Sequence, residues 1–184
     1  MPVTTIANRQ ATPRKQIARG ADDFNVTKIL LTGGPCAGKT SALSEIQNDL
    51  TQQNYKVVMV PEAASLLAKG GAMIDATKFA PGEGLAFQKI LMNLQISLEE
   101  TYSDIARMVD DQHVVMLIDR GLCDGSAYVS KEDWQAVMDD LNMNTITMRE
   151  NRYDGVLHLV TAADGAEKFY QGDNVRSEGL EMAR

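Results

Sequence analysis

The sequence has few cysteine and aromatic residues and no long apolar run. Its two cysteines, Cys36 and Cys123, lie far apart and have no companions at the spacing of metal ligands, which excludes a disulfide framework and indicates a reducing compartment. No apolar run reaches the roughly 20 residues that span a bilayer, and the first residues lack a compact apolar signal core. We therefore expect free thiols, a cytoplasmic location and no transmembrane segment.

Basic residues are in the minority. The chain has 18 Lys and Arg against 25 Asp and Glu, a formal net charge of −7, which argues against a nucleic-acid partner because phosphate backbones attract clustered cations. Its 184 residues, 44% of them hydrophobic, can bury one sizeable core and leave little room for a second domain. An acidic chain can still bind a nucleotide, because backbone N–H groups and a metal ion can neutralise the phosphates.

The first residues differ from the rest of the chain in charge. Residues 1–20 have no acidic residue and no apolar periodicity, and they hold Arg9, Arg14, Lys15 and Arg19. We interpret residues 1–24 as a disordered basic arm and residues 25–184 as the folded domain. A mitochondrial presequence is the less favoured interpretation, because the apolar residues are too sparse for an amphipathic face. The arm could bind an anionic lipid surface or a protein partner.

Short apolar runs alternate with helical patterns along the folded part. Strands are predicted at four runs, namely residues 28–32, 56–60, 114–118 and 155–160. The second and third are apolar without alternation, as in parallel strands that are covered on both faces. Helices are predicted over residues 41–50 and, as one long helix or two consecutive ones, 84–109. This order predicts a doubly wound α/β fold with a mostly parallel sheet.

The predicted sheet has few strands for its class. Only four are predicted, and none follows the last helical pattern. We therefore expect a sheet that lacks its last strand and a chain that is short at its C-terminus. A missing strand would leave an exposed sheet edge.

The sequence GGPCAGKT at residues 33–40 matches the P-loop pattern G-x-x-x-x-G-K-[ST] and lies between a predicted strand and a predicted helix. Its glycines let successive N–H groups face phosphate oxygens, and the helix N-terminus adds its positive dipole end. The pattern predicts that ATP or GTP binds with Mg²⁺, and that Thr40 is a metal ligand. A glycine turn that only joins strand and helix is the alternative. The predicted nucleotide-binding residues are Gly33, Gly34, Pro35, Cys36, Ala37, Gly38, Lys39, Thr40 and Ser41.

Two carboxylates follow predicted strands. Asp119 ends the third apolar run, where a carboxylate can hold Mg²⁺ beside the P-loop. The alternative for Asp119 is a cap or a salt bridge with Arg120. Glu62 follows the second run, where it could accept a proton from an acceptor hydroxyl. Alternatively, it could be a residue at the start of a helix whose negative charge interacts favourably with the helix dipole. The sequence leaves these two interpretations of Glu62 open.

Three arginines are candidates for clamping phosphate oxygens, because a guanidinium fork matches phosphate geometry. They are Arg120, Arg176 and Arg184, of which Arg120 is best placed and Arg176 lies in a polar segment suited to a closing lid. Ordinary solvated helix charges are the alternative for the two later ones. We interpret His113 and His158, which have no ligand spacing around them, as structural.

Five short motifs together resemble a known family. They are residues 33–41, 61–65 (PEAAS), Phe87 with Gln88, 119–121 (DRG) and 153–155 (YDG). Over residues 25–184 the chain resembles the AAA_28 family of nicotinamide-riboside-kinase-like P-loop ATPases, and within it the eukaryotic TRPL-translocation-defect proteins. The resemblance implies that Gln88 binds the base or amide of a substrate. It also implies a GTP- or ATP-binding, lipid-associated protein, often with a following triphosphate-tunnel domain that this sequence lacks.

Two functions are consistent with these features. The first is a small-molecule kinase in which Glu62, Asp119, Arg120 and Arg176 are catalytic, Gln88 binds the acceptor, and the acceptor is a nucleoside or riboside. The second is a nucleotide-dependent regulatory switch that recruits a protein or an anionic membrane with little or no catalysis.

Overall fold

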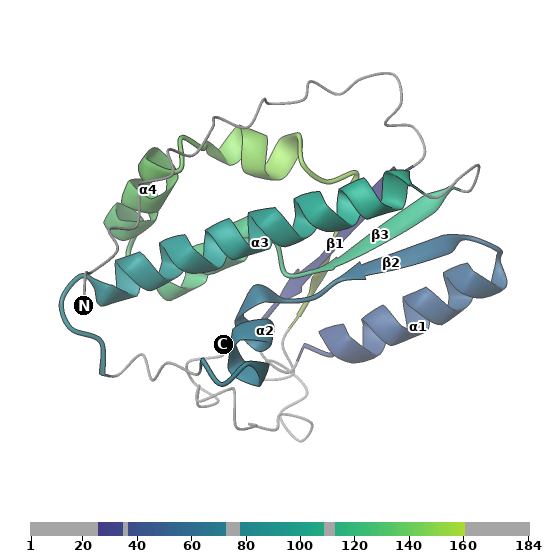
Figure 1. Cartoon of the computed structure of the whole chain (residues 1–184), viewed down its shortest axis with the longest axis horizontal. Coiled ribbons are helices and arrows are strands. Elements are labelled where there is room, and N and C mark those ends of the chain that lie inside the picture. Colours follow the sequence, from purple (N-terminus) through teal and green to yellow (C-terminus); the bar gives the residue numbers. More distant parts are fainter. Residues whose placement is uncertain (1–25, 35–36, 73–77, 109–112, 161–184) are drawn as a thin grey trace, which may run out of the picture.

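A parallel β-sheet forms the centre of the computed structural model, which describes residues 26–34, 37–72, 78–108 and 113–160 (Figure 1). The four strands of this part of the chain lie in the order β2-β3-β1-β4, and every neighbouring pair is parallel. Their bounds are β1 Val26–Gly33, β2 Lys56–Val60, β3 Val114–Asp119 and β4 Gly155–Leu159. Because all four run the same way, their carboxyl ends share one edge of the sheet.

The strand register places three strand ends level with one another. Leu31 of β1 is opposite Asp119 of β3, and Val60 of β2 is opposite Ile118. The P-loop, Glu62 and Arg120 therefore all leave the sheet at the same edge. This is the crevice in which open α/β sheets bind ligands.

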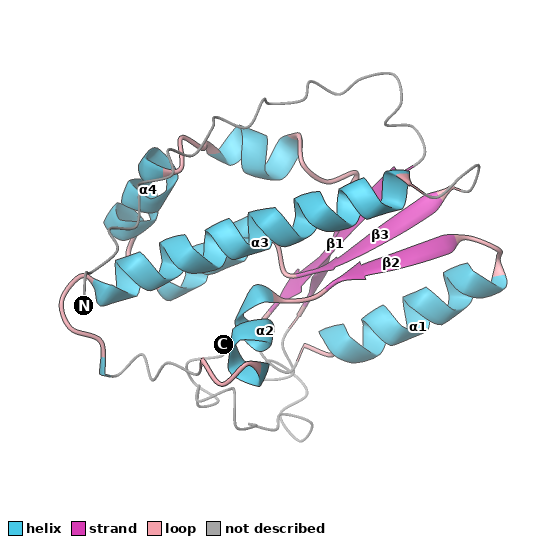
Figure 2. Cartoon of the chain, in the orientation of Figure 1, coloured by secondary structure: helices cyan, strands magenta, loops and turns pink. Residues whose placement is uncertain are grey.

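Helices cover both faces of the sheet (Figure 2). Helix α1, Lys39–Gln52, packs on one face, and α3, Glu83–Arg107, packs on the other. The side chains of β3 alternate between them, since Val115 and Leu117 belong to the α1 side and Val114, Met116 and Ile118 to the α3 side. All five are buried. The predicted doubly wound α/β fold is confirmed, and the apolar runs reflect burial on both faces.

A further group of elements, the outer layer, packs against the N-terminal part of α3. It consists of η3, Leu122–Tyr128, α4, Lys131–Asp140, and η4, Ile146–Glu150. A separate apolar cluster holds it in place, formed by Met92, Leu122, Val137, Met138 and Met148. None of these three elements was predicted. Ser130 is a signal for α4 in the sequence, because serine is a preferred N-cap residue. In the structure its side-chain oxygen accepts a hydrogen bond from the Asp133 backbone N–H.

The predicted elements agree closely with the observed ones. The stretch predicted as one helix or two is the single helix α3, Glu83–Arg107, and the short helix α2, Ala63–Lys69, lies between β2 and α3 in the sequence. The apolar periodicity of α3 was a poorer guide to its buried face, because Ile90, Ile105 and Met108 are exposed. The most buried residues of α3 include Gln88, Gln95, Glu99 and Ser103.

No helix within the described ranges is long and apolar enough to cross a membrane. The predicted basic arm of residues 1–24, Pro35, Cys36, Arg176 and Arg184 lie outside the described residues.

Candidate functional site

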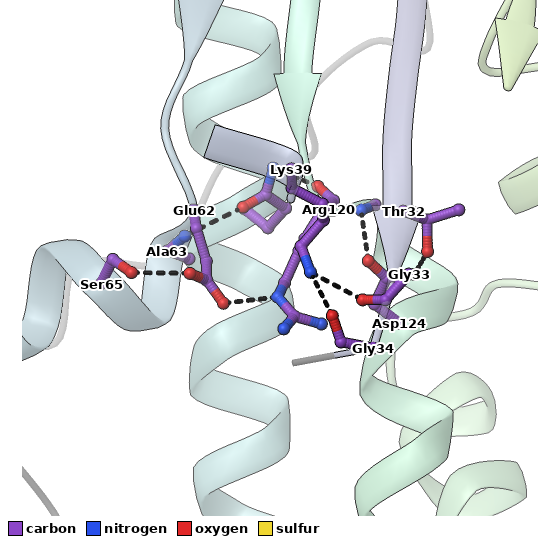
Figure 3. A network of polar contacts seen from close by, with 11 residues as sticks. Thr32, Gly33, Gly34, Lys39, Glu62, Ala63, Ser65, Arg120 and Asp124 are labelled. Carbon is purple, nitrogen blue, oxygen red and sulfur yellow. Dashed lines mark hydrogen bonds and ion pairs between the residues drawn. The ribbon is translucent and has the colours of Figure 1, made fainter. Parts of the chain in front are cut away.

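The candidate site lies where β1, β2 and β3 end (Figure 3). The P-loop follows β1, Glu62 follows β2, and Arg120 follows β3. Polar contacts connect these three strand ends, as the close-up shows. The sheet therefore brings together groups that the sequence places far apart.

Gly33 allows the P-loop to leave the sheet in close contact with the next strand. A β-carbon built on Gly33 would lie 2.2 Å from the carbonyl oxygen of Leu159, and its φ of +142° is one that other residues rarely adopt. Gly38 adopts a left-handed conformation with φ of +77° and is the N-cap residue of α1. The two outer glycines of the motif thus set the exit from β1 and the entry into α1.

The side chain of Lys39 lies inside the loop. Its ammonium Nζ donates to the carbonyl oxygens of Gly33 and Gly34, each at 2.7 Å, and the residue is only 5% exposed. The first turn of α1 contains no acidic residue, so nothing there offsets the positive end of the helix dipole. Thr40 and Ser41 are exposed at this end. A fixed ammonium and a helix N-terminus together form an anion-binding site.

Glu62 and Arg120 form an ion pair across the ends of β2 and β3. Arg120 Nε lies 2.7 Å from Glu62 Oε1, and both side chains are mostly buried, with 16% and 23% exposed. Ser65 Oγ donates to the other carboxylate oxygen of Glu62 at 2.6 Å. Glu62 is the N-cap residue of α2, but its side chain makes no capping hydrogen bond. The Glu62 carboxylate is thus engaged by the side chains of Arg120 and Ser65.

Arg120 keeps its charge in this setting. Burial by itself lowers the pKa of the guanidinium, but nearby anionic groups, Glu62 first among them, more than offset this, and the pKa is raised. Its backbone has a φ of +65°, which is unusual for a residue with a β-carbon. Figure 3 shows the resulting direction of the side chain, toward Glu62 and beside the P-loop.

Asp124 is a site residue that sequence analysis missed. Its Oδ1 accepts from Thr32 Oγ1 at 2.5 Å and its Oδ2 from the Gly121 backbone N–H at 3.2 Å, so it joins η3 to the strand before the P-loop. Burial raises the pKa of its carboxyl, partly offset by the Thr32 hydrogen bond and by Arg120. No motif marks Asp124, because its partner Thr32 is remote in the sequence.

The oxygen donors near the P-loop fit Mg²⁺. Asp119 is half-buried at the end of β3, and Thr40 supplies an exposed hydroxyl at the start of α1. No group of three or more His, Cys, Asp or Glu that could hold a metal occurs in the described part of the chain. A small oxygen-donor set suits Mg²⁺, which is commonly held by one or two carboxylates with substrate phosphates and water, without a protein cage.

Gln88 is buried on α3, next to η3. Its side chain is buried against η3 and α4, since a β-carbon built at Gly125 would lie 3.1 Å from Gln88 Oε1 and 3.2 Å from Trp134. It is seven residues before Gln95 on the same helix, about 10 Å along the axis. The predicted substrate residue therefore lies on the same side of α3 as Gln95, against the outer layer.

His113 has the structural position that we predicted. Its ring Nε2 lies 2.8 Å from Thr27 Oγ1, and its ring packs edge-on against Tyr55. These contacts lie at the amino end of the strands, opposite the P-loop.

Comparisons with known proteins give a family and several structural likenesses. The family model AAA_28, described as an AAA domain, matches residues 28–184. One similar solved structure is deoxyadenosine kinase from M. mycoides with bound dATP, with 20% identity over 85% of this chain and 77% of that chain and a TM-score of 0.41. The same enzyme with the products dCMP and a flexible dCDP has 18% identity, the same coverage and a TM-score of 0.46. A search of curated proteins found no match.

The family model covers the P-loop, the ion pair and every described strand except the first residues of β1. A nucleotide-binding P-loop domain is what both this match and the geometry of Lys39 support. The chain belongs to the AAA_28 family of AAA domains.

Proposed function

We propose that this protein is a Mg²⁺-dependent kinase that transfers the terminal phosphoryl group of ATP or GTP to a hydroxyl group of a small molecule, such as a nucleoside or riboside. The Glu62–Arg120 pair beside the P-loop is the observation that carries the proposal. Nucleotide binding alone needs the loop and a metal. A buried carboxylate with an arginine at the neighbouring strand end suits transfer to an alcohol.

The P-loop residues hold the donor. The backbone N–H groups of the loop and the side chain of Lys39 bind the β- and γ-phosphates, and Ser41 contacts a phosphate. Thr40 and Asp119 would hold the metal. When bound, Mg²⁺ would neutralise negative charge on the phosphate oxygens. Lys39 already lies within the loop, 2.7 Å from two of its carbonyl oxygens. The ammonium therefore needs little reorganisation to meet a phosphate.

Glu62 accepts the proton of the acceptor hydroxyl. Ser65 and Arg120 each engage one of its oxygens, and a carboxylate offers about four acceptor sites, which leaves capacity for a substrate hydroxyl. The acceptor oxygen forms a bond to the γ-phosphorus, the bond from that phosphorus to the bridging oxygen breaks, and a nucleoside diphosphate leaves. Arg120 stabilises the charge on the transferred group. Gln88 would contribute to acceptor binding from α3, and Arg176 remains a candidate lid residue.

Product analysis tests the proposal. The full chain is incubated with ATP or GTP, Mg²⁺ and a panel of nucleosides and ribosides, and phosphorylated acceptors are identified by mass spectrometry. At least one acceptor should gain one phosphoryl group with release of an equal amount of nucleoside diphosphate. Nucleotide binding without a phosphorylated acceptor from any member of the panel would contradict the proposal.

The regulatory switch is the competing interpretation. It rests on the basic arm and on the resemblance to the TRPL-translocation-defect proteins. Nucleotide-dependent binding to liposomes that contain an anionic lipid, without transfer to any acceptor, would favour it.

A further inference from the structure

A polar cluster that the proposed mechanism does not use lies at the sheet-facing side of α3. It consists of Gln95, Glu99, Arg152 and Tyr153. Gln95 is 6% exposed and Glu99 is 3% exposed, and both belong to α3. Arg152 and Tyr153 reach them from the loop before β4. Buried polar groups destabilise a fold unless they are hydrogen-bonded, so their partners show what they hold in place.

Gln95 joins the backbone beside Glu62 to the backbone of Arg120. Its Oε1 accepts from the Ala63 backbone N–H at 3.2 Å, and its Nε2 donates to the carbonyl oxygen of Arg120 at 3.2 Å. Ala63 follows Glu62 directly. The Gln95 carboxamide thus connects the ends of β2 and β3 through their backbones. The ion pair connects the same two strand ends through side chains.

Glu99 sets the direction of the Gln95 carboxamide. Gln95 Nε2 also donates to Glu99 Oε1 at 3.3 Å, and a carboxylate can only accept. The amide nitrogen must therefore face Glu99 and Arg120, which leaves the amide oxygen for the Ala63 N–H. A reversed carboxamide would place oxygen against oxygen and nitrogen against an N–H donor.

Arg152 and Tyr153 hold Glu99 in turn. Arg152 Nε donates to Glu99 Oε2 at 2.6 Å, and Tyr153 OH donates to Oε1 at 3.2 Å. The Tyr153 hydroxyl also accepts from the Leu122 backbone N–H at 3.2 Å, close to Arg120 in the chain. Burial raises the pKa of Tyr153, so its hydroxyl stays a donor. Every member of the cluster has a partner.

The backbone of Arg120 needs such support. Its φ of +65° is unfavourable for a residue with a β-carbon and persists where surrounding contacts fix it. The Arg120 N–H donates to the Leu31 carbonyl at 3.0 Å, and the Arg120 carbonyl accepts from Gln95. The two bonds hold both sides of the residue. This conformation directs the guanidinium toward Glu62.

We propose that Gln95 is a positioning residue, which aligns Glu62 with Arg120, and that Glu99, anchored by Arg152 and Tyr153, fixes the orientation in which Gln95 works. The effect of Gln95 on catalysis rests on the proposed function, whereas its alignment of Glu62 with Arg120 does not. Two measurements test the alignment and the catalytic effect separately.

The first measurement needs no activity. The energetic coupling between Glu62 and Arg120 is obtained from urea unfolding of the wild type, Glu62→Gln, Arg120→Gln and the double variant, and the cycle is repeated with Gln95→Met. Methionine has a similar length and no carboxamide, so it removes the hydrogen bonds while filling the space. The coupling should be largely lost with Gln95→Met. An unchanged coupling would overturn the proposal.

Ser103→Ala is the matched control. Ser103 is a buried polar residue on the same helix, 2% exposed, and its Oγ has no hydrogen-bond partner within the described part of the chain. The Glu62–Arg120 coupling should be the same in this background as in the wild type. Tyr153→Phe is the milder second variant, for use should Gln95→Met not fold. It keeps the ring, removes one donor to Glu99, and should weaken the coupling in the same direction; an unchanged value would again count against the proposal.

The second measurement is kinetic. With an acceptor that the wild type phosphorylates, Gln95→Met should lower kcat on the order of 100-fold, because small displacements of catalytic groups are costly, while the Kd for the nucleotide stays unchanged. Equal losses in kcat and nucleotide affinity would indicate general disruption and contradict a positioning role. A wild type that phosphorylates no acceptor would defeat the proposed function, and the coupling measurement would still decide the role of Gln95.

Discussion

Arg120 Nε lies 2.7 Å from Glu62 Oε1, although the two residues follow different strands. The parallel sheet places the ends of β2 and β3 side by side, and the left-handed backbone of Arg120 directs its side chain to the carboxylate. Both groups are mostly buried, so water screens their interaction less than it would at the surface. The pair lies beside a P-loop lysine that is itself buried.

Loss of the P-loop lysine should abolish tight nucleotide binding. Lys39→Ala removes the ammonium that the loop encloses, and a charged hydrogen bond contributes about 1.5–3 kcal/mol, so nucleotide affinity should fall roughly 10- to 100-fold. Isothermal titration calorimetry with Mg²⁺ and ATP or GTP measures this. Lys131→Ala, at the exposed start of α4, is the control and should bind as the wild type does. Equal affinity of Lys39→Ala and wild type would show that the loop does not bind phosphate in this way.

The ion pair should contribute to stability. Arg120→Gln leaves the Glu62 carboxylate mostly buried without its counter-ion, and we expect the free energy of unfolding to fall by about 2 kcal/mol, between surface and fully buried pairs. Urea unfolding at neutral pH measures the change. Arg107→Gln, on an exposed pair with Asp104, should change stability by less than about 1 kcal/mol. Similar losses in the two variants would mean that burial of the Glu62–Arg120 pair adds nothing.

Gly33 and Gly84 should respond oppositely to alanine. At Gly33 the new β-carbon would lie 2.2 Å from the Leu159 carbonyl oxygen, so β1 or β4 must shift, and we expect a loss of about 2 kcal/mol or more. Gly84 lies within α3, and its β-carbon would approach Phe79 only to 3.7 Å. Alanine there should stabilise by about 0.5–1 kcal/mol. Thermal and urea unfolding of the two variants check the contrast, which equal effects would refute.

Ionisation of the Asp124 carboxyl should lower the free energy of unfolding as pH rises. Burial raises the pKa of its carboxyl in the folded state, so the folded protein binds a proton more tightly than the unfolded chain does. The unfolded value is about 3.9. From there up to the folded pKa, this residue's contribution to the free energy of unfolding decreases, and above that pKa the loss is complete.

Asp124→Asn tests this prediction. The carboxamide can still accept from the Gly121 N–H and donate to the Thr32 oxygen, so the contacts are kept and the titration is removed. The stability of Asp124→Asn relative to the wild type should increase with pH across this range. Urea unfolding at several pH values measures it, and a difference that stays constant with pH would contradict the raised pKa.

The sheet and the P-loop could be predicted from the sequence because their signals are local. The strand at 56–60 was predicted with the bounds observed, and the loop pattern needs only eight consecutive residues. Strands buried on both faces are continuously apolar, which makes them easy to recognise. The place of Glu62 and Arg120 at that edge could be predicted, because parallel strands end there, but their ion pair was not predicted.

The other features of the site depend on contacts between residues that are remote in the sequence. Asp124 acquires its role from Thr32, and Gln95 acquires its role from Ala63 and Arg120, none of which is a neighbour in the sequence. The apolar periodicity of α3 also misled, because its buried face accommodates Gln95 and Glu99 through a polar network. A buried polar face is visible only when its partners are known.

Transfer by Glu62→Gln tests the central claim most directly. Under saturating Mg²⁺ and nucleotide, the single-turnover rate of acceptor phosphorylation is compared between wild type and Glu62→Gln, with Glu45→Gln, exposed on α1, as control. We predict that Glu62→Gln retains the nucleotide affinity of the wild type and loses roughly 100-fold or more in transfer rate, because the proton acceptor is gone. Transfer by Glu62→Gln at the wild-type rate would contradict the account.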